Sequence, residues 1–266
     1  MDQILFQVGK ITVTWYGTLL ALGFLAALWT GSRRAVRVGI SPEKVWDVGP
    51  WLIIGTVIGA RLVYVIQYGD KFEGKPFWHY FAVWQGGLVF YGGLFGASGA
   101  CILFCWLNKI ALWRFADVLA PSVALGHAIG RIGCLMNGCC FGRACELPWA
   151  IKFPVGHETY PHMVHPTQIY ESLLNFSLYL ALVWVFRKWR KFDGQVFAVY
   201  LMGYAAVRST VEIFRGDYPA DYYVGGWMTP AHWVSVAILA VGVMLYAWQK
   251  ANPAAKVTVE TKVEKA

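Results

Sequence analysis

The chain has 266 residues, of which 58% are hydrophobic, 17% aromatic and only 14% charged, and its formal net charge is +8. A soluble domain of this length needs a more polar surface, so the composition excludes that class and predicts an all-α polytopic membrane protein. The positive balance does not indicate a nucleic-acid partner, because basic residues of membrane proteins collect in their cytoplasmic segments.

Seven apolar segments are long enough to be predicted as transmembrane helices. In chain order they are 13–31, 46–68, 87–107, 115–136, 169–186, 195–214 and 231–248. Arg33, Arg34 and Arg37 follow the first segment instead of preceding it, which predicts a retained span and not a cleaved signal peptide. We expect residues 1–252 to form one transmembrane domain, and residues 253–266 to form a polar, disordered tail.

The distribution of Lys and Arg predicts the orientation of these spans. With the N-terminus outside, the inner segments hold fourteen of the 23 basic residues and the outer segments hold six. This asymmetry favours an outer N-terminus and a cytoplasmic C-terminus. The loops at 137–166 and 216–229 then become extracytoplasmic, and the first, which contains four prolines, is expected to be ordered.

Small residues recur at four-residue spacing on two neighbouring spans. They are Gly55 and Gly59 on the second span, and Gly92, Gly96 and Ala100 on the third. Because lipid supplies no hydrophobic drive between helices, such faces indicate close backbone packing.

Among the charged residues within the predicted spans, where an unpaired charge is costly, three arginines and one glutamate are candidates for a site. They are Arg61, Arg131, Arg208 and Glu212. Arg208 and Glu212 are four residues apart on one helix face, so one interpretation is an internal ion pair that neutralises itself. The alternative is an anion receptor near the outer ends of the spans, where arginine forks would bind the phosphate of a lipid headgroup.

Two tyrosines and one histidine lie near these charges in the predicted topology. Tyr16 and Tyr91 fall near the outer ends of their spans, where they either belong to an aromatic interface belt or hydrogen-bond a headgroup. His127 precedes Arg131 by four residues, and we interpret it as a core histidine whose hydrogen bonds are satisfied.

Four of the six cysteines gather near the predicted outer mouth: Cys134, Cys139, Cys140 and Cys145. Their spacing is not that of the usual zinc sites, so we predict no metal and no cofactor. A disulfide in an oxidising outer compartment is the stronger alternative, with a connectivity that the sequence does not give.

Several motifs, in order along nearly the whole chain, resemble the bacterial prolipoprotein diacylglyceryl transferase family. They are Trp15-Tyr16-Gly17, Gly59-Ala60-Arg61, Trp84-Gln85-Gly86-Gly87-Leu88, Gly130-Arg131-Ile132-Gly133 with Asn137-Gly138 and Gly142, His165-Pro166-Thr167-Gln168-Ile169-Tyr170-Glu171, and Gly203-Tyr204 followed by Arg208, Glu212 and Arg215.

The resemblance implies an enzyme of the bacterial inner membrane, with its active site toward the outer leaflet. Such an enzyme moves the diacylglyceryl group of phosphatidylglycerol onto the lipobox cysteine of a prolipoprotein, forming a thioether and releasing glycerol phosphate. The implied catalytic residues are Arg131, Arg208, Glu212 and Tyr91. The implied phosphatidylglycerol-binding residues are Arg131, Tyr16, Asn137, Gly142 and Arg61.

The chain departs from the family pattern at three positions. Many members carry His at the position of Tyr91, and that His is a candidate base, whereas tyrosine titrates near pH 10 and is a better hydrogen-bond donor. Cys134 and Cys139 stand where the commoner motif has Asn and Glu.

Two other functions are compatible with these residues. One is a diverged paralogue that uses the outer cysteines for thiol redox or metal chemistry. The other is a small-solute transporter lined by the three span arginines, although transporters usually show an internal repeat and none is evident here.

Overall fold

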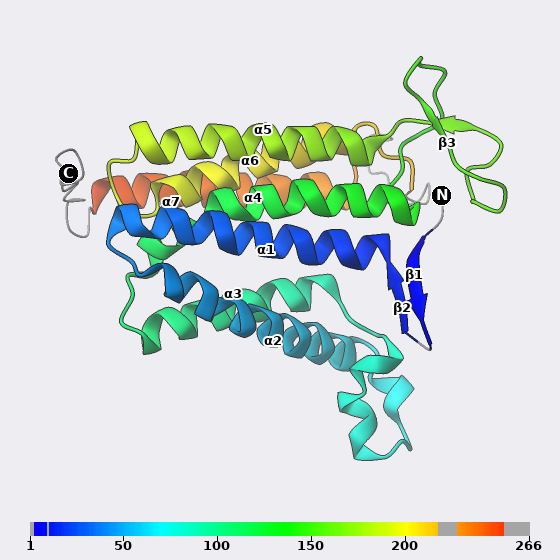
Figure 1. The fold of residues 1–266 in the computed structure, drawn as a ribbon, viewed down its shortest axis with the longest axis horizontal. Coiled ribbons are helices and arrows are strands. Elements are labelled where there is room, and N and C mark those ends of the chain that lie inside the picture. The colour runs from blue at the N-terminus through cyan, green and yellow to red at the C-terminus, as the bar shows by residue number, and fades with distance from the viewer. Residues whose placement is uncertain (1–2, 10, 218–227, 253–266) are drawn as a thin grey trace. The chain divides into compact units, whose positions relative to one another are not determined.

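The computed structural model describes residues 3–9, 11–217 and 228–252, and seven α-helices occupy most of this part of the chain (Figure 1). They are α1 (Trp15–Ala35), α2 (Pro42–Gln67), α3 (Phe90–Leu107), α4 (Leu112–Asn137), α5 (Thr167–Lys188), α6 (Gln195–Glu212) and α7 (Pro230–Ala251). Each predicted span corresponds to one helix, and the ends agree to within four residues. Long apolar segments therefore predicted the helical framework correctly.

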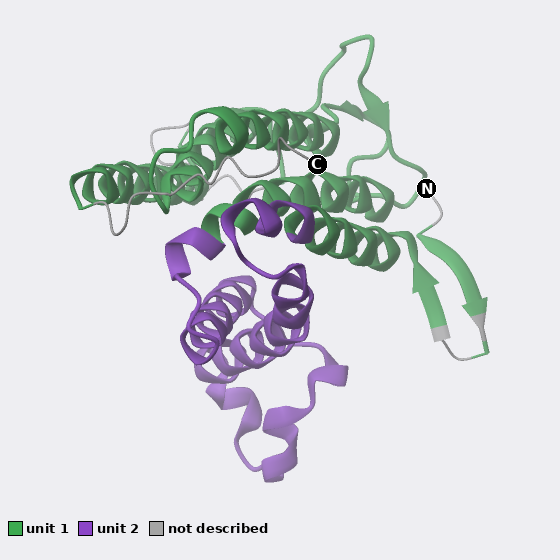
Figure 2. Cartoon of the chain, turned by 60° about the vertical axis from the view of Figure 1, so that its left-hand side comes forward, with its two compact units in different colours: residues 1–31, 116–266 green, residues 32–115 purple. Residues whose placement is uncertain are grey.

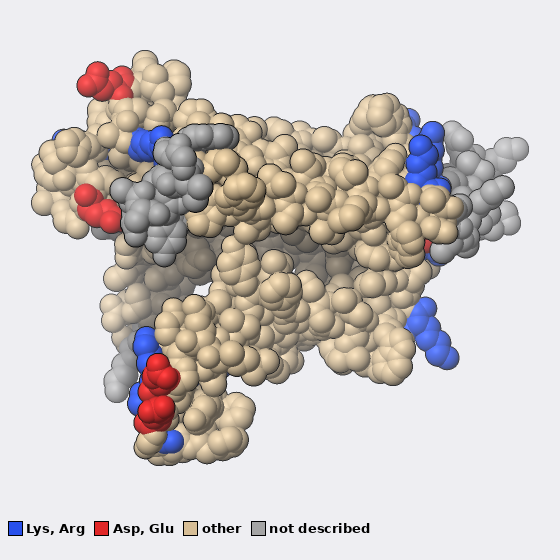
Figure 3. All heavy atoms as spheres, turned by 180° about the vertical axis from the view of Figure 1, so that it is seen from behind, with Lys and Arg blue, Asp and Glu red and all other residues tan. Residues whose placement is uncertain are grey.

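Five of the helices are long and apolar enough to cross a membrane, namely α2, α3, α4, α5 and α7. This is the pattern of a multi-pass membrane protein. α1 and α6 do not meet the same standard, and α6 carries both Arg208 and Glu212. The predicted count of seven spans, and their orientation, stay predictions. On the face shown in Figure 3, charged side chains lie near the helix ends and leave the helix middles without visible charge.

Two short antiparallel hairpins add to the helices and were not predicted. β1 (Ile4–Val8) pairs with β2 (Ile11–Thr14), and β3 (Ile151–Lys152) pairs with β4 (Met163–Val164). The predicted ordered loop at 137–166 contains the second hairpin, and Phe141, Phe153 and Val164 form its small core. Most of the predicted loop at 216–229, and the whole tail from residue 253, lie outside the described residues.

Contacts along the chain divide it into two compact units (Figure 2). Unit 1 comprises Met1–Gly31 and Ala116–Ala266, and unit 2 comprises Ser32–Phe115. In unit 1, α6 packs along α5 and α7, while α1 approaches α4 closely. A Cβ atom on Gly23 would lie 2.9 Å from the Gly126 carbonyl oxygen, so a larger side chain there would separate the two helices.

A buried carboxylate on α4 fixes the start of α6 in unit 1. Asp117 is fully buried and accepts hydrogen bonds from the backbone N–H groups of Gly194 and Phe197, both at 2.9 Å. Arg190 Nε donates to the same carboxylate at 3.0 Å. Because the first N–H groups of a helix lack partners within the helix, Asp117 caps α6 from outside it.

In unit 2 the predicted small-residue faces do meet. A Cβ atom on Gly55 would lie 2.6 Å from both Ala100 Cβ and the Gly96 carbonyl oxygen, and one on Gly96 would lie 2.9 Å from Gly59 Cα. The backbones of α2 and α3 therefore touch without intervening side chains, as such glycine faces predict.

The connection from α2 to α3 is built from three short 3-10 helices, η2 (Gly69–Phe72), η3 (Phe77–Phe81) and η4 (Val83–Gln85). α3 begins three residues later than the predicted span, because Gly86 and Gly87 have φ angles of 79° and 75° and end the loop in a left-handed conformation. A side chain on Gly87 would also collide with the Tyr64 ring.

We expect Gly96→Ala to destabilise the protein, since the added methyl group must push α2 and α3 apart, at a cost of about 1–3 kcal/mol. Gly99→Ala is the matched control, because its Cβ meets nothing within 4 Å on the same helix. The midpoint of thermal unfolding in detergent checks this. It should fall for Gly96→Ala and stay the same or rise for Gly99→Ala, and equal midpoints would contradict the packing.

Candidate functional site

A buried ion pair joins the last turns of α4 to the first turns of α5. Arg131 Nη2 lies 2.9 Å from Glu171 Oε1, and the Glu171 side chain is only 2% exposed. Arg131 Nε donates to His127 Nε2 at 3.1 Å, and that nitrogen lies 3.4 Å from Glu171 Oε1. The histidine thus accepts from the arginine with Nε2, and its side chain is 24% exposed. The prediction of a core histidine with satisfied hydrogen bonds stays a prediction.

The first turn of α5 is fastened to α4 and to the loop that follows it. Ser172 Oγ donates to the Ala128 carbonyl at 2.8 Å. Thr167 Oγ1 donates to the Cys140 carbonyl at 2.6 Å, and Gln168 Nε2 donates to the Cys139 carbonyl at 2.7 Å. These bonds fix α5 against α4, so the Glu171 carboxylate is held in place before any ligand arrives.

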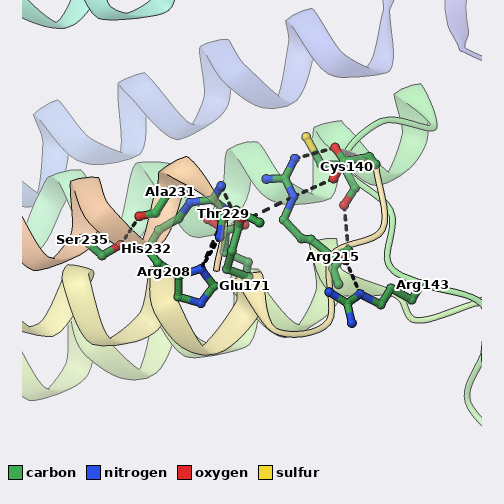
Figure 4. Close-up of polar contacts among 12 residues, drawn as sticks. Cys140, Arg143, Glu171, Arg208, Arg215, Thr229, Ala231, His232 and Ser235 are labelled. Atoms are coloured by element: carbon green, nitrogen blue, oxygen red, sulfur yellow. Dashed lines mark hydrogen bonds and ion pairs between the residues drawn. The ribbon is translucent and has the colours of Figure 1, made fainter. Parts of the chain in front are cut away.

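A second ion pair lies near the end of α6, and Figure 4 shows Arg208 and Glu171 together in this region. Arg208 Nη2 lies 2.7 Å from Glu212 Oε2, which confirms the predicted pairing on one helix face. Thr229 Oγ1 donates to Glu212 Oε1 at 2.5 Å, and Thr229 also forms the capping box of α7 with His232. Thr229, the N-cap residue of α7, therefore holds the Glu212 carboxylate, and that carboxylate orients Arg208 on α6.

A third arginine follows α6 directly. Arg215 Nε lies 2.9 Å from Asp217 Oδ1 and 4.0 Å from Glu212 Oε2, and its carbonyl accepts from Arg143 Nε at 3.0 Å (Figure 4). We call Arg131, Arg208 and Arg215, with Glu171, Glu212 and Asp217, the arginine cluster. Its members act on one another electrostatically, Arg215 on Arg131 and Arg208 on Glu171.

The arginine cluster can bind an anion, because the Arg131 guanidinium group is held in place and still has N–H donors for a ligand. A guanidinium has five N–H donors. Arg131 uses Nε and Nη2, and within the described part of the chain no residue accepts from its Nη1. A phosphate oxygen is a suitable acceptor for such a fork.

Three further predicted residues surround this end of unit 1. Tyr16 packs over Gly133, where a Cβ atom would lie 3.3 Å from its ring. The carbonyl of Asn137 accepts from Gln3 Nε2 at 3.0 Å. A Cβ atom on Gly142 would lie 2.5 Å from His165 Cβ, so the glycine is required for the loop to cross there. The steric demand at Gly142 is independent of any ligand.

Three thiols also meet at the end of α4. The sulfur atoms of Cys134, Cys139 and Cys140 all lie within 4.8 Å of one another, whereas Cys145 is not a member of this group. All six cysteines of the chain are free thiols. Hydrogen bonds from Cys134 and Cys140 lower the pKa of the Cys139 thiol, which stands in the loop after α4.

The remaining predicted residues, Arg61 and Tyr91, belong to unit 2. Arg61 is buried, and it donates to four loop carbonyls: Tyr80 and His79 at 2.9 and 2.7 Å, and Gly86 and Gly87 at 2.7 and 3.2 Å. Four of its five donors are thereby occupied, which gives Arg61 a loop-anchoring role. Tyr91 is half exposed in the first turn of α3. The predicted lipid contact of Arg61 and catalytic role of Tyr91 stay predictions.

Glu171 and Asp217 are residues of this site that the sequence did not single out. For Glu171 the reason is clear. Its position within the His165–Glu171 motif was evident, but a lone glutamate at the start of a helix does not reveal its partner. Only the packing of α5 on α4 brings it to Arg131.

Comparison with known proteins gives one consistent result. The family model for prolipoprotein diacylglyceryl transferase matches residues 3–248. The phosphatidylglycerol–prolipoprotein diacylglyceryl transferase of Vibrio cholerae is 36% identical over 252 residues, which cover 93% of this chain and 91% of that protein. The enzymes of the same name from Synechococcus elongatus and Chromohalobacter salexigens are 34% and 33% identical, covering 92% and 95% of this chain and 86% and 94% of their own lengths.

We expect Glu171→Gln to lower stability by about 3 kcal/mol, because it leaves the partly buried Arg131 cation without its carboxylate. The thermal unfolding midpoint in detergent measures this, and Glu146→Gln on the exposed loop is the control. If both variants have the same unfolding midpoint as the wild type, the ion pair does not hold α5 on α4.

We expect Arg61→Lys to loosen the loop at 69–87, since one ammonium group cannot replace four hydrogen bonds to carbonyls in fixed directions. Hydrogen exchange of the loop amides should accelerate. The control is Arg37→Lys, an exposed arginine between α1 and α2, which should leave the exchange of these amides unchanged. Unaltered protection in Arg61→Lys would refute the anchoring role.

Proposed function

The chain belongs to the prolipoprotein diacylglyceryl transferase family, and from this premise we propose that the arginine cluster binds the phosphate of phosphatidylglycerol during diacylglyceryl transfer. The chain transfers the diacylglyceryl group of phosphatidylglycerol to the cysteine thiol of a prolipoprotein lipobox. The observation that carries this assignment is the buried Arg131–Glu171 pair, which fixes a guanidinium group while leaving Nη1 for a ligand.

The chemistry requires one bond to form and one to break. The lipobox sulfur forms a thioether with the glyceryl carbon that carries the phosphate. The bond between that carbon and the phosphate oxygen breaks, and its electron pair leaves with glycerol phosphate. Negative charge therefore grows on the leaving phosphate, which is where fixed cations lower the barrier most.

Four members of the cluster have a proposed part in this step. Arg131 and Arg208 bind the phosphate oxygens, and Glu212 orients Arg208 through the 2.7 Å ion pair. Glu171 does the same for Arg131. Each carboxylate lowers the net positive charge of the cluster. Glu171 and Glu212 therefore serve to orient the arginines and do not strengthen their attraction for the phosphate.

The headgroup pocket is proposed to include Tyr16, Asn137 and Gly142 beside Arg131. Tyr16 is within electrostatic reach of Arg131, which supports its place in the pocket. Tyr91 is proposed to donate a hydrogen bond to the substrate. Arg61 is proposed to support lipid binding through the loop that it anchors, in keeping with its bonds to the loop carbonyls.

The membrane arrangement is also a proposal in its finer detail. We propose seven spans in one transferase domain of the bacterial inner membrane, with the N-terminus outside, the C-terminus cytoplasmic and the arginine cluster toward the outer leaflet. The charge asymmetry of the loops supports this orientation. Phosphatidylglycerol would then enter the site laterally from the bilayer.

We expect Arg131→Ala to reduce transfer to a lipobox peptide in phosphatidylglycerol vesicles by at least about 100-fold, the usual cost of removing a fixed donor to developing charge. Arg208→Ala should have a loss of the same order. Arg187→Ala, on the exposed far end of α5, should keep the wild-type rate. Transfer by Arg131→Ala at the wild-type rate would reject the phosphate-binding assignment.

A further inference from the structure

The three converging thiols lie beside the arginine cluster. Cys134 follows Arg131 by three residues on α4, so the two side chains share a helix face. Cys139 and Cys140 come from the loop that immediately follows, and all three sulfur atoms lie within 4.8 Å of one another. Arg131 and Tyr16 both act electrostatically on this group.

The loop that carries two of the thiols is held by buried side chains. Thr167 and Gln168 are each 1% exposed and hydrogen-bond the carbonyls of Cys140 and Cys139. Gly138 turns the chain with a φ of 77°, and Cys140 itself has a φ of 62°, an uncommon conformation for a residue other than glycine. The convergence of the sulfur atoms is thus imposed by the surrounding structure.

A catalytic zinc site has three protein ligands and leaves a fourth position for substrate or water, and cysteine sulfur is one of the ligands that zinc takes. Zn–S bonds are about 2.3 Å long, so sulfur atoms around a tetrahedral zinc are about 3.8 Å apart. The thiols need to move by only about 1 Å to reach that geometry. Thiolate ligands select soft cations such as Zn²⁺ over Mg²⁺ or Ca²⁺.

We propose that Cys134, Cys139 and Cys140 hold a Zn²⁺ ion that binds and activates the lipobox cysteine of the prolipoprotein. This inference rests on the proposed function, because it assigns the site at which the second substrate of the same reaction is bound. Cys145 stands outside the group and is not a ligand.

The reaction requires the lipobox cysteine as a thiolate, because only the thiolate reacts. A thiol with a pKa of about 8.5 is mostly protonated at neutral pH. A thiol that coordinates zinc is deprotonated. Tyr91, for which a hydrogen bond to the substrate is proposed, is a poor base at neutral pH because tyrosine titrates near pH 10. Metal coordination would supply the thiolate without a base.

The balance of the step is as follows. The lipobox thiol takes the fourth position on zinc and releases its proton to water. Its sulfur then donates an electron pair to the glyceryl carbon, and the bond from that carbon to the phosphate oxygen breaks, with its electron pair leaving on glycerol phosphate. The thioether product is uncharged and a weaker ligand than a thiolate, so it leaves the zinc.

The first test is spectroscopic and does not depend on activity. The full chain in phosphatidylglycerol nanodiscs, kept reduced with a phosphine, is loaded with Co²⁺ in place of Zn²⁺. We expect one equivalent to bind to the wild type and to Cys145→Ser, with an intense thiolate-to-cobalt absorption. The band should weaken in Cys134→Ser, Cys139→Ser and Cys140→Ser, and should strengthen when a lipobox peptide is added, but not its serine analogue.

The second test measures transfer after the metal is removed by a chelator. We expect the rate of transfer to fall by about 100-fold or more, which is the usual effect of losing a group that assists proton transfer. Adding Zn²⁺ should restore the rate. Full transfer by the metal-free chain, or a Cys134–Cys139 disulfide in the intact mass of the active enzyme, would overturn the zinc proposal.

These outcomes separate the zinc proposal from the transferase assignment. Metal-free transfer that still requires Arg131 would leave the transferase function standing and reject the zinc. A chain that binds cobalt but transfers nothing in any metal state, with its fold intact by circular dichroism, would reject the proposed function instead.

Discussion

The ion pair between Arg131 and Glu171 is the constraint on which the site depends. A guanidinium group within an apolar helix is costly unless a carboxylate lies beside it. Meeting that requirement brings the first turn of α5 against the last turns of α4. The second pair does the same for α6 and α7, since Glu212 is held by the cap residue of α7. Arg131 and Arg208 also both act electrostatically on Glu171, which relates the two ion pairs to each other.

Arginines in similar apolar surroundings have different roles in the two units. Arg131 pairs with a carboxylate and keeps a donor for a ligand, whereas Arg61 gives four donors to backbone carbonyls of the loop that follows α2. The first arrangement is suited to binding, because its charge is held but not fully used. The second is suited to support, because the loop takes nearly all of its donors. The role of each arginine therefore depends on what accepts its hydrogen bonds: one carboxylate for Arg131, and four loop carbonyls for Arg61.

Properties of single segments were predictable from the sequence, but side-chain contacts between segments far apart in the chain, such as Arg131 with Glu171, were not. Apolar length predicted the seven helices, and four-residue spacing predicted both the glycine contact of α2 with α3 and the Arg208–Glu212 pair. The partnership of Glu171 with Arg131 depends on how two helices pack, so no local pattern shows it. The same holds for the three thiols, because the bend at Gly138 and the hydrogen bonds from α5 bring them together. The short hairpins were missed because two to five residues carry little periodic signal.

The central claim, that Arg131 and Arg208 contact the phosphate of phosphatidylglycerol, is tested most directly by solid-state NMR. The measurement is the dipolar coupling between ¹⁵N-labelled arginine side chains and the ³¹P nucleus of phosphatidylglycerol bound to the chain. We expect a coupling of hydrogen-bond range that weakens in Arg131→Lys and in Arg208→Lys and persists in Arg187→Lys. A coupling that both cluster variants leave unchanged would contradict it.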